Sequence, residues 1–480
     1  MSTLNPIAEH HALQTRRQLL GRSIAGLGAM ALSQLLGTKS SSGAVLPTHV
    51  PKAKRIIYLF QNGGPSHLEL FDPKPRLTQM SGEPFPESVI GGVRFSTMTA
   101  NEDKFVLGAV TEFARAGRSG MELSSSHLPY TSQIADKICL IRSMHTEQVN
   151  HAPAITFLLT GGERPGRPTI GAWLSYGLGS ESENLPAYVC MTSVSKGTTC
   201  GQTFYDHYWG SGFLPTVHQG VKFRGNGSPV LYLENPKGMS SSVRRGLLDD
   251  LKQMNQWNYE QMGDPEIQTR IAQYEMAYRM QTSVPELTDL SQESEAILAM
   301  YGPGVREKGT FAYNCLMARR LAERGTRFIQ VMHGGWDQHK SITTEFNQQC
   351  LDTDQPSAAL VRDLEMRGLL DDTLVIWGGE FGRTPFLQGK FEEREFWGRD
   401  HHPYGFSLWM AGGGVKPGHV HGATDEFGFH VAEDPVHVHD LQATLLHLMG
   451  IHHKELTYKF QGRQYRLTDV HGRVVQGILS

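Results

Sequence analysis

Short apolar runs, rich in β-branched and aromatic residues, alternate along the chain with longer stretches in which apolar residues recur at helical spacing. Several of the runs are continuously apolar, which is typical of strands buried on both faces of a mostly parallel sheet. Strands that alternate with helices indicate an α/β fold with helices on both faces of the sheet. We predict a three-layer α/β/α sandwich with strands at 55–60, 137–141, 187–191, 230–233, 327–332, 373–377 and 406–411, and helices at 170–178, 242–281, 312–324, 343–367 and 441–449.

The alternation breaks between about residues 205 and 305, where the sequence is loop-rich at first and then polar and helical. We predict that this stretch is an insertion or cap over the sheet, within one large domain that spans residues 47–480. The content of 39% hydrophobic and 19% charged residues is ordinary for a globular protein. Lys and Arg number 45 against 48 Asp and Glu, which argues against a nucleic-acid-binding protein because such proteins usually carry a basic excess.

Glycine-rich turns that carry His, Asp, Glu and Arg lie at the ends of four predicted strands. In open α/β sheets, ligands bind beyond the C-terminal ends of the strands, and glycine lets the backbone approach a ligand closely. The convergence of such turns is the strongest functional signal in the sequence. The four segments are 61–67 (QNGGPSH), 333–339 (HGGWDQH), 378–385 (GGEFGRTP) and 398–403 (GRDHHP).

Two pairs of charged or imidazole side chains in these turns each have two interpretations. Asp337 and His339 are two residues apart and either chelate a divalent cation or cap the helix that follows. Glu380 and Arg383 form either a structural ion pair, or a metal ligand and a bidentate contact to an anionic substrate. The functional interpretation of these pairs predicts a metal site with an anion beside it.

The chain has 22 histidines, and half of them follow residue 400, which by itself suggests metal binding. His401 and His402 are adjacent, so in an extended segment they point to opposite sides and at most one of them ligates. We interpret the later histidines as structural or solvated, because only His439, beside Asp440, has a carboxylate at metal-ligand spacing. Imidazoles and carboxylates without thiolates suit Zn, Mn, Mg or Ca.

The N-terminal segment has the pattern of an export signal. Residues 15–21 (TRRQLLG) place two arginines before a Gly- and Ala-rich apolar stretch, as in bacterial twin-arginine signals. The alternative is a membrane-anchoring helix, but the apolar stretch is only about 15 residues long, whereas roughly 20 are needed to cross a bilayer. We predict that residues 1–46 are a signal and linker, that the twin-arginine machinery exports the chain to the periplasm or beyond, and that the mature chain has no membrane span.

The order of these motifs resembles that of the alkaline-phosphatase-like superfamily, which includes sulfatases and phosphatases. More narrowly, the chain is similar over about residues 49–475 to a sulfatase-related family of twin-arginine-exported bacterial proteins. The resemblance implies an alkaline-phosphatase-like fold and a metal-dependent site for sulfate or phosphate esters. The strings that carry it are YLFQNGGPSHLELFDPKP, GGWDQH, GLLDDTLVIWGGEFGRTP, GRDHHP, AGGGVKPG and GRQYRLTDVHG.

The sequence departs from the sulfatase pattern at the nucleophile. Sulfatases carry Cys/Ser-x-Pro-x-Arg followed by Leu-Leu-Thr-Gly, and residues 151–161 (HAPAITFLLTG) keep the proline and the LLTG. His151 takes the place of the nucleophile and Ile155 that of the arginine. An imidazole can act as a metal ligand, a general base or a nucleophile, and we rank the first two roles for His151 above the third.

The metal ligands of the superfamily are also altered. Glu380 and Phe381 stand where the resemblance expects an Asp and a His ligand, and Gln61 or Asn62 takes the place of the acidic ligand that ends the first strand. A two-metal phosphatase site needs several carboxylates and imidazoles to hold its cations. These losses argue against the ordinary sulfatase mechanism.

The leading hypothesis is therefore an exported, metal-dependent hydrolase of sulfate or phosphate esters with a rearranged site, whose substrate is an anionic small molecule or glycan. The alternative is a non-catalytic sulfatase-like scaffold that binds anionic glycans or a partner protein. A third hypothesis makes the 205–305 insertion a contact surface for another exported enzyme. The predicted site residues are His151 and Arg383 for catalysis; Asp337, His339, Glu380, His401 and His402 for metal; and Asn62, Ser66, His67, His333 and Arg399 for substrate.

Overall fold

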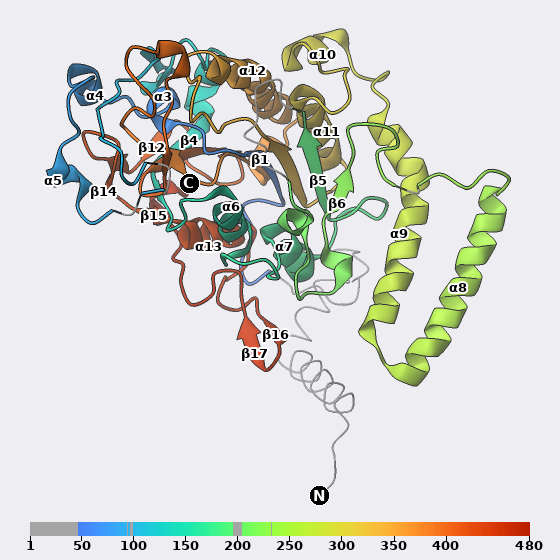
Figure 1. Cartoon of the computed structure of the whole chain (residues 1–480). Helices are drawn as coiled ribbons and strands as arrows, with labels where there is room; N and C mark the ends of the chain where they lie inside the picture. The colour runs from blue at the N-terminus through green and yellow to red at the C-terminus, as the bar shows by residue number, and fades with distance from the viewer. Residues whose placement is uncertain (1–46, 94, 97–98, 195–203, 232) are drawn as a thin grey trace, which may run out of the picture.

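A computed structural model describes residues 47–480 apart from 94, 97–98, 195–203 and 232 (Figure 1). The predicted export signal and linker, residues 1–46, lie outside the described residues. The described chain contains a nine-stranded sheet of order β12-β4-β11-β8-β1-β7-β5-β6, with β15 paired to β4. Its strands are β1 (Arg55–Gln61), β4 (Ile138–His145), β5 (Tyr188–Ser193), β6 (Val221–Phe223), β7 (Phe328–His333), β8 (Thr373–Gly378), β11 (Phe406–Ala411), β12 (His419–His421) and β15 (Val436–His437).

The sheet is mostly parallel. Strand β11 runs antiparallel to its neighbours β4 and β8, and the other neighbouring strands pair in parallel. In the centre, Gln61 of β1 lies level with His333 of β7, and Phe60 lies level with Gly378 of β8. The C-terminal ends of β1, β7 and β8 therefore meet at one edge of the sheet, where β11 begins.

Helices cover both faces of this sheet (Figure 1). All residues of β1 are buried, and alternate side chains enter opposite cores, as the two-residue period of a strand requires. Ile57 and Leu59 join the core that holds α11 (Phe311–Glu323) and α12 (Glu345–Met366). Ile56 and Phe60 join the core that holds α6 (His151–Thr160), α7 (Ile170–Leu178) and α13 (Val438–Leu448). The predicted three-layer α/β/α fold with a mostly parallel sheet is confirmed.

Shorter elements surround the sheet and its two helix layers. The helices are α3 (His67–Leu70), α4 (Pro75–Gln79), α5 (Glu87–Ile90) and α10 (Glu295–Tyr301), and the two-stranded ribbons are β2 (Phe113–Ala116) with β3 (Met121–Ser124), β9 (Gly382–Arg383) with β10 (His401–His402), β13 (Ala423–Thr424) with β14 (Val431–Glu433), and β16 (Tyr458–Phe460) with β17 (Arg463–Tyr465).

Two sequence predictions of secondary structure were wrong. The strand expected at 230–233 is absent from the described residues there, and Leu231 is 57% exposed; the nearby strand is β6, which extends the sheet beside β5. The helix expected at 242–281 is two helices, α8 (Ser241–Met262) and α9 (Pro265–Thr288). Gly263 ends α8 with a φ of 66°, and the Asp264 side chain accepts a hydrogen bond from the backbone at the start of α9.

Helices α8 and α9 form a hairpin that projects from the body of the molecule (Figure 1). Met280, Val284 and Leu287 of α9 are buried in the main core, whereas no residue of α8 is buried. The predicted insertion thus combines an edge strand with a projecting helical hairpin, and its status as a separate cap stays a prediction. Within the described part of the chain, no helix is both long enough and apolar enough to cross a membrane.

Candidate metal site

Four side chains converge at the edge where β1, β7 and β8 end. Asp337 and His339 lie in the loop after β7, His401 lies in β10, and His151 is the first residue of α6. One ligand atom from each of these residues lies within 4.8 Å of those of the other three. Residues separated by up to 250 positions therefore form one group of potential metal ligands.

The imidazole nitrogens meet around a single carboxylate oxygen. Oδ1 of Asp337 lies 3.2 Å from Nε2 of His151, 3.1 Å from Nε2 of His339 and 3.1 Å from Nε2 of His401. Nε2 of His339 also lies 2.9 Å from Nε2 of His401. Three imidazoles thus present the same ring nitrogen to one point.

The opposite ring nitrogen of each imidazole faces an oxygen that only accepts hydrogen bonds. Each Nδ1 therefore carries a proton, and Nε2 presents its lone pair whenever the ring is neutral. Metal-bound histidines are oriented in this way in proteins. When the rings are neutral, their lone pairs and the Asp337 carboxylate repel one another unless a cation lies between them, so the donor set fits a metal ion. The acceptors are Glu380 Oε1 for His151 (2.6 Å), Gln388 Oε1 for His339 (2.7 Å) and the Val149 carbonyl for His401 (2.8 Å).

The electrostatics of the group keep Asp337 charged and His401 neutral. Burial raises the pKa of Asp337, but the Arg383 guanidinium and the three imidazoles outweigh burial and hold that pKa well below its usual range. Burial lowers the pKa of His401 to about 3. Burial also disfavours the charged form of His151, but its contacts with Asp337 and Glu380 prevail and raise the pKa of His151 above its usual value.

Glu380, predicted as a metal ligand, is not in the group of four. Its Oε1 accepts from Nδ1 of His151 at 2.6 Å and from the Gly63 amide at 3.0 Å. Both contacts hold the carboxylate behind the His151 ring, on the side away from Asp337. Glu380 therefore orients His151, and we revise its predicted role accordingly.

Arg383, predicted to contact an anionic substrate, is buried, and each of its three nitrogens donates to a protein oxygen. Its Nε donates to the Gly64 carbonyl at 2.9 Å, and Nη1 donates to the Arg399 carbonyl at 3.0 Å. Nη2 donates to the Gly63 carbonyl and lies 2.6 Å from Oδ1 of Asp337. Arg383 therefore positions Asp337 and the loop after β1.

Arg399 and Ser66, both predicted to bind substrate, belong to a separate buried cluster. Arg399 pairs with Glu69 at 2.7 Å, and neither side chain is exposed. Other nitrogens of Arg399 donate to the carbonyls of Thr384 and Gly108, and the Ser66 hydroxyl donates to Glu69. This cluster links the loops near the site. We therefore assign Arg399 and Ser66 a structural role in place of the predicted contact with substrate.

His402 and His67, predicted as a metal ligand and a substrate-binding residue, lie outside the group as well. His402 hydrogen-bonds the Phe429 carbonyl and stacks on the Phe429 ring at 4.3 Å. His67 is buried, with Nε2 3.0 Å from the Gly428 carbonyl. Because adjacent residues of a strand point to opposite sides, β10 turns His401 toward Asp337 and His402 away from it.

The two remaining candidates, Asn62 and His333, differ in their surroundings. The Asn62 side chain is fully buried, and neither its amide nitrogen nor its oxygen has a hydrogen-bond partner among the described residues. Its predicted contact with substrate stays a prediction. His333 is buried at the end of β7 between Ser193 Oγ at 2.9 Å and Gln349 Oε1 at 3.0 Å, so it is held by the protein rather than presented to a ligand.

The burial of His333 predicts a loss of stability in acid. Burial lowers the pKa of His333 from 6.5 to about 4, so between these pH values the unfolded chain binds a proton that the folded chain excludes. The stabilisation is complete above pH 6.5 and declines as pH falls, by up to about 1.4 kcal/mol per pH unit for one such group. Scanning calorimetry at pH 7, 6 and 5 should show a falling melting temperature. The fall should be shallower in His333→Gln, and an equal fall in that variant would contradict the assignment.

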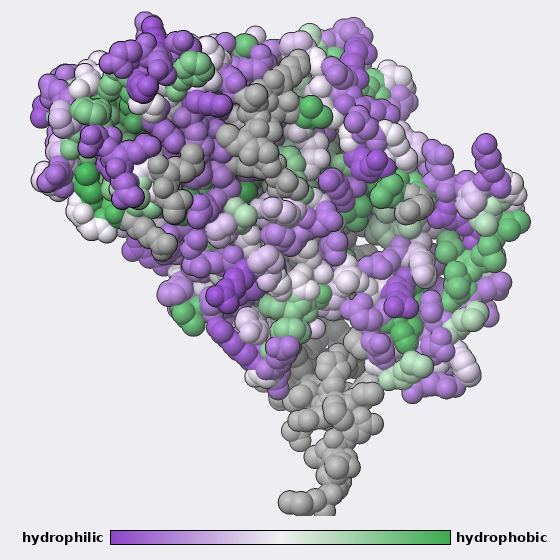
Figure 2. Space-filling model, in the orientation of Figure 1, coloured by the Kyte–Doolittle hydropathy of each residue, from purple (hydrophilic) through white to green (hydrophobic). Residues whose placement is uncertain are grey.

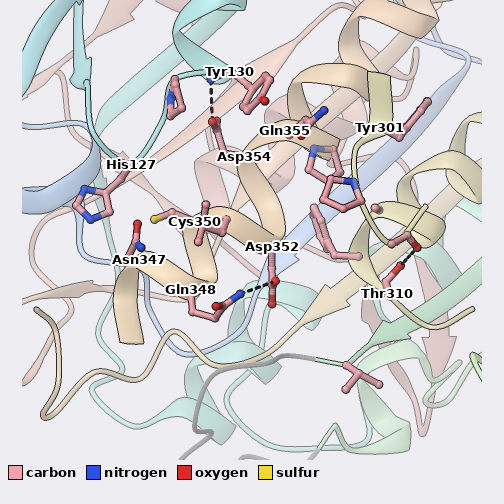
Figure 3. Close-up of a pocket in the computed structure, with 18 of the residues that line it drawn as sticks. His127, Tyr130, Tyr301, Thr310, Asn347, Gln348, Cys350, Asp352, Asp354 and Gln355 are labelled. Atoms are coloured by element: carbon pink, nitrogen blue, oxygen red, sulfur yellow. Dashed lines mark hydrogen bonds between the residues drawn. The ribbon is translucent and has the colours of Figure 1, made fainter. Parts of the chain in front are cut away.

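A separate cleft of about 340 Å³ lies along α12 and contains none of the predicted site residues (Figure 3). Its acidic side chains already bind protein groups. Asp354 accepts from the Tyr130 amide at 2.8 Å, and Asp352 accepts from Gln348 at 3.0 Å. We therefore assign no chemistry to this cleft.

Fold and site together describe an α/β protein with a candidate imidazole–carboxylate metal centre at the C-terminal edge of its sheet. The chain belongs to the family described as "Protein of unknown function (DUF1501)", whose model matches residues 53–479. That span is close to the one over which the motifs resemble a sulfatase-related family. No curated protein matches the chain.

Several solved structures are similar to the chain at low sequence identity. The PsFucS1 sulfatase from Pseudoalteromonas sp. is 13% identical, with 88% of this chain and 70% of that chain covered and a TM-score of 0.33. The phosphonate monoester hydrolase SpPMH from Silicibacter pomeroyi is 11% identical, with coverage of 83% and 73% and a TM-score of 0.31. A mutant of TAB5 alkaline phosphatase with Mg bound is 10% identical, with coverage of 83% and 99% and a TM-score of 0.33. These similarities are distant.

Proposed function

We propose that the chain is a metal-dependent hydrolase of phosphate or sulfate esters, in which Asp337, His339 and His401 hold the metal and His151 acts as general base. The observation that supports this proposal most directly is the convergence of three Nε2 atoms on Oδ1 of Asp337, with every Nδ1 held by an oxygen. The site lies at the sheet edge where ligands of open α/β folds bind.

The donor set fits a divalent transition metal. Two imidazoles and one carboxylate leave coordination positions open for a substrate or water, as in catalytic rather than structural sites. Imidazole suits zinc and other transition metals, whereas calcium and magnesium prefer oxygen ligands. Of the predicted metals, we therefore favour Zn over Mn, Mg and Ca. When bound, such a metal supplies Lewis-acid polarisation of the ester oxygen.

His151 and Glu380 form a pair suited to proton transfer. Glu380 holds the Nδ1 proton at 2.6 Å, which fixes the tautomer and leaves Nε2 of His151 as the acceptor. Nε2 faces the group of ligands, so it is placed to take a proton from a water molecule there. Because no hydroxyl or thiol occupies position 151, we propose direct attack by water instead of a covalent intermediate.

Ester hydrolysis, as opposed to metal binding alone, is supported by the sequence resemblance to sulfatases and phosphatases. Each nitrogen of the buried guanidinium groups of Arg383 and Arg399 already donates to a protein oxygen. The negative charge of a substrate would therefore be met by the cation itself. The alternative of a non-catalytic scaffold for anionic glycans or a partner protein rests on the missing nucleophile.

Metal analysis and an ester panel on the purified full chain test the proposal. We expect about one divalent ion per chain, and hydrolysis of a nitrophenyl phosphate, phosphodiester or sulfate that a chelator abolishes and zinc or manganese restores. A chain that binds metal but turns over none of these esters would favour the scaffold. A chain that neither binds nor responds to a divalent ion would exclude both the centre and the mechanism.

Gly63 provides a further test of the ligand geometry. Its φ is 121°, and a Cβ at this position would lie 2.7 Å from the Asp337 amide nitrogen. Gly63→Ala should displace Asp337 and weaken zinc binding by about 10- to 100-fold, comparable to the loss of an outer-shell partner. Competition with a chromophoric chelator measures the Kd. The control is Gly92→Ala, where a Cβ would meet nothing within 4 Å; equal Kd values for the two variants would contradict the prediction.

Export through the twin-arginine route to the periplasm or extracellular space remains part of the proposal. It rests on residues 15–21 and the apolar stretch that follows them. Fusing residues 1–46 to a reporter that is active only after folded export tests it. The arginines at positions 16 and 17 should be required for the reporter signal, and activity that survives their replacement by lysine would argue against this route.

A further inference from the structure

Helix α8 carries a row of large apolar side chains that stay exposed in the described part of the chain. We define the α8 apolar row as the six residues that are between 41% and 62% exposed: Val243, Leu247, Leu251, Met254, Trp257 and Met262. Figure 2 shows hydrophobic residues following the outer edge of the projecting hairpin. Six exposed large side chains on one helix exceed the single exposed apolar residues that are normal on protein surfaces.

The spacing of the row shows that it occupies one face of the helix. Successive members are three to five residues apart, which keeps them on a continuous stripe. A different side faces α9, because Arg245 pairs with Glu275 of α9 at 2.8 Å and Gln256 accepts a hydrogen bond from Gln268 of α9 at 3.0 Å. The α8 apolar row therefore lies beside the contact with α9 and is not part of it.

The charge on α8 favours a protein over an anionic membrane as the partner that covers the α8 apolar row. Three basic residues of α8 are balanced by three acidic residues, and helices that lie on anionic membranes are instead rich in Lys and Arg on the polar face. The mixed charges suit a protein partner with similarly mixed charges. The residues are Arg244, Arg245 and Lys252 against Asp249, Asp250 and Glu260.

The size of the row matches what a second copy of this chain requires. A helix of 22 residues is about 33 Å long, and six large side chains exposed by 41–62% approach the roughly 800 Å² that each partner gives to a standard interface. A second copy offers an identical row, and two-fold symmetric pairs of identical chains are the commonest oligomers. Antiparallel contact between the two rows would place two α8–α9 hairpins together as four packed helices.

We propose that the α8 apolar row is the interface of a symmetric dimer of this chain, formed by antiparallel packing of the two projecting hairpins. The dimer would bury the row and leave the candidate metal site of each copy unchanged, since no residue of α8 belongs to that site. The insertion would then serve self-association. The hypothesis drawn from the sequence instead made it a contact surface for another exported enzyme.

Light scattering coupled to size exclusion tests the dimer on the full chain. The chain mass is 53.4 kDa, and at tens of micromolar we expect twice that mass. Met254→Glu and Trp257→Glu should each raise the dissociation constant by about 30-fold or more, as expected for the loss of a central apolar contact. Gln253→Glu adds the same charge to an exposed position off the row and should leave the dimer intact. Circular dichroism of each variant shows whether it is folded.

Cross-linking tests the antiparallel geometry independently. Met254 lies near the middle of the row, so Met254→Cys should form a disulfide between copies under mild oxidation, whereas Gln253→Cys should not. A wild-type chain that is monomeric at 50 µM, or a dimer that persists in both charged variants, would overturn the proposal. Binding of a monomeric chain to anionic lipid vesicles would assign the row to a membrane.

Discussion

His401→Ala is expected to abolish stoichiometric metal binding, whereas His402→Ala is expected to retain it. The two imidazoles are adjacent in sequence and both buried, but only His401 places Nε2 3.1 Å from Oδ1 of Asp337. His402 instead hydrogen-bonds the Phe429 carbonyl and stacks on that ring. Loss of a direct ligand should weaken binding by more than the 10- to 100-fold typical of an outer-shell partner.

Inductively coupled plasma mass spectrometry after dialysis measures the metal content of both variants. His402→Ala removes a buried ring and should lower the melting temperature, so it controls for general damage to the loop. Asp337→Asn provides a second comparison, because it removes the charge from the oxygen on which the three imidazoles converge. Full metal content in His401→Ala, or its loss only in His402→Ala, would show that the ligands are assigned wrongly.

His151→Ala is expected to retain the metal and to lose turnover. Nδ1 of His151 contacts the Glu380 carboxylate at 2.6 Å. Nδ1 of His339 instead contacts Gln388 at 2.7 Å, with the Asp400 carboxylate farther away at 3.7 Å, and Nδ1 of His401 contacts the Val149 carbonyl. A carboxylate behind the ring suits His151 as a proton acceptor, beside a metal held by Asp337, His339 and His401. Loss of a general base typically lowers kcat by about 10²- to 10⁴-fold, so we expect a decrease in that range.

Metal content and kcat measured on the same preparation separate the two roles of His151. Glu380→Gln should also lower kcat with the metal retained, because an amide no longer enforces the Nδ1 proton. His145→Ala changes a histidine outside the group of four and should alter neither quantity. If His151→Ala loses its metal as His401→Ala is expected to, His151 is a fourth ligand and the base must be sought elsewhere.

The layers of the fold could be predicted from the sequence because buried strands and helices have recognisable patterns of apolar residues. A strand such as β1, apolar at nearly every position, is compatible with a sheet covered on both sides, and helices α7 and α11 followed from their apolar spacing. The run at 230–233 has similar composition but is too short to distinguish a strand from a turn. The break in the long insertion helix was marked by Gly263 and Pro265, which end and begin helices.

The location of the site could also be predicted, but the roles of individual side chains could not. Glycine-rich turns after strands indicated the edge where Asp337, His339 and His401 meet. Sequence does not show that Arg383 and Arg399 are enclosed by backbone carbonyls, because those carbonyls come from segments up to 320 residues away. Gln388, which holds the His339 ring, was missed for the same reason, since a lone glutamine in a loop carries no pattern.

The carbonyl contacts of Arg383 have a thermodynamic consequence. One guanidinium joins the loop after β1, the loop after β7 and the segment around Arg399, so Asp337 is in place only when those segments are docked together. A cation that selects this arrangement binds the native state and not the unfolded chain, so its binding free energy adds to the stability of the whole sheet. Lysine, with three donors on one nitrogen, could not span the same oxygens. We therefore expect metal loading and folding to be linked equilibria in this protein, coupled through the Arg383 side chain.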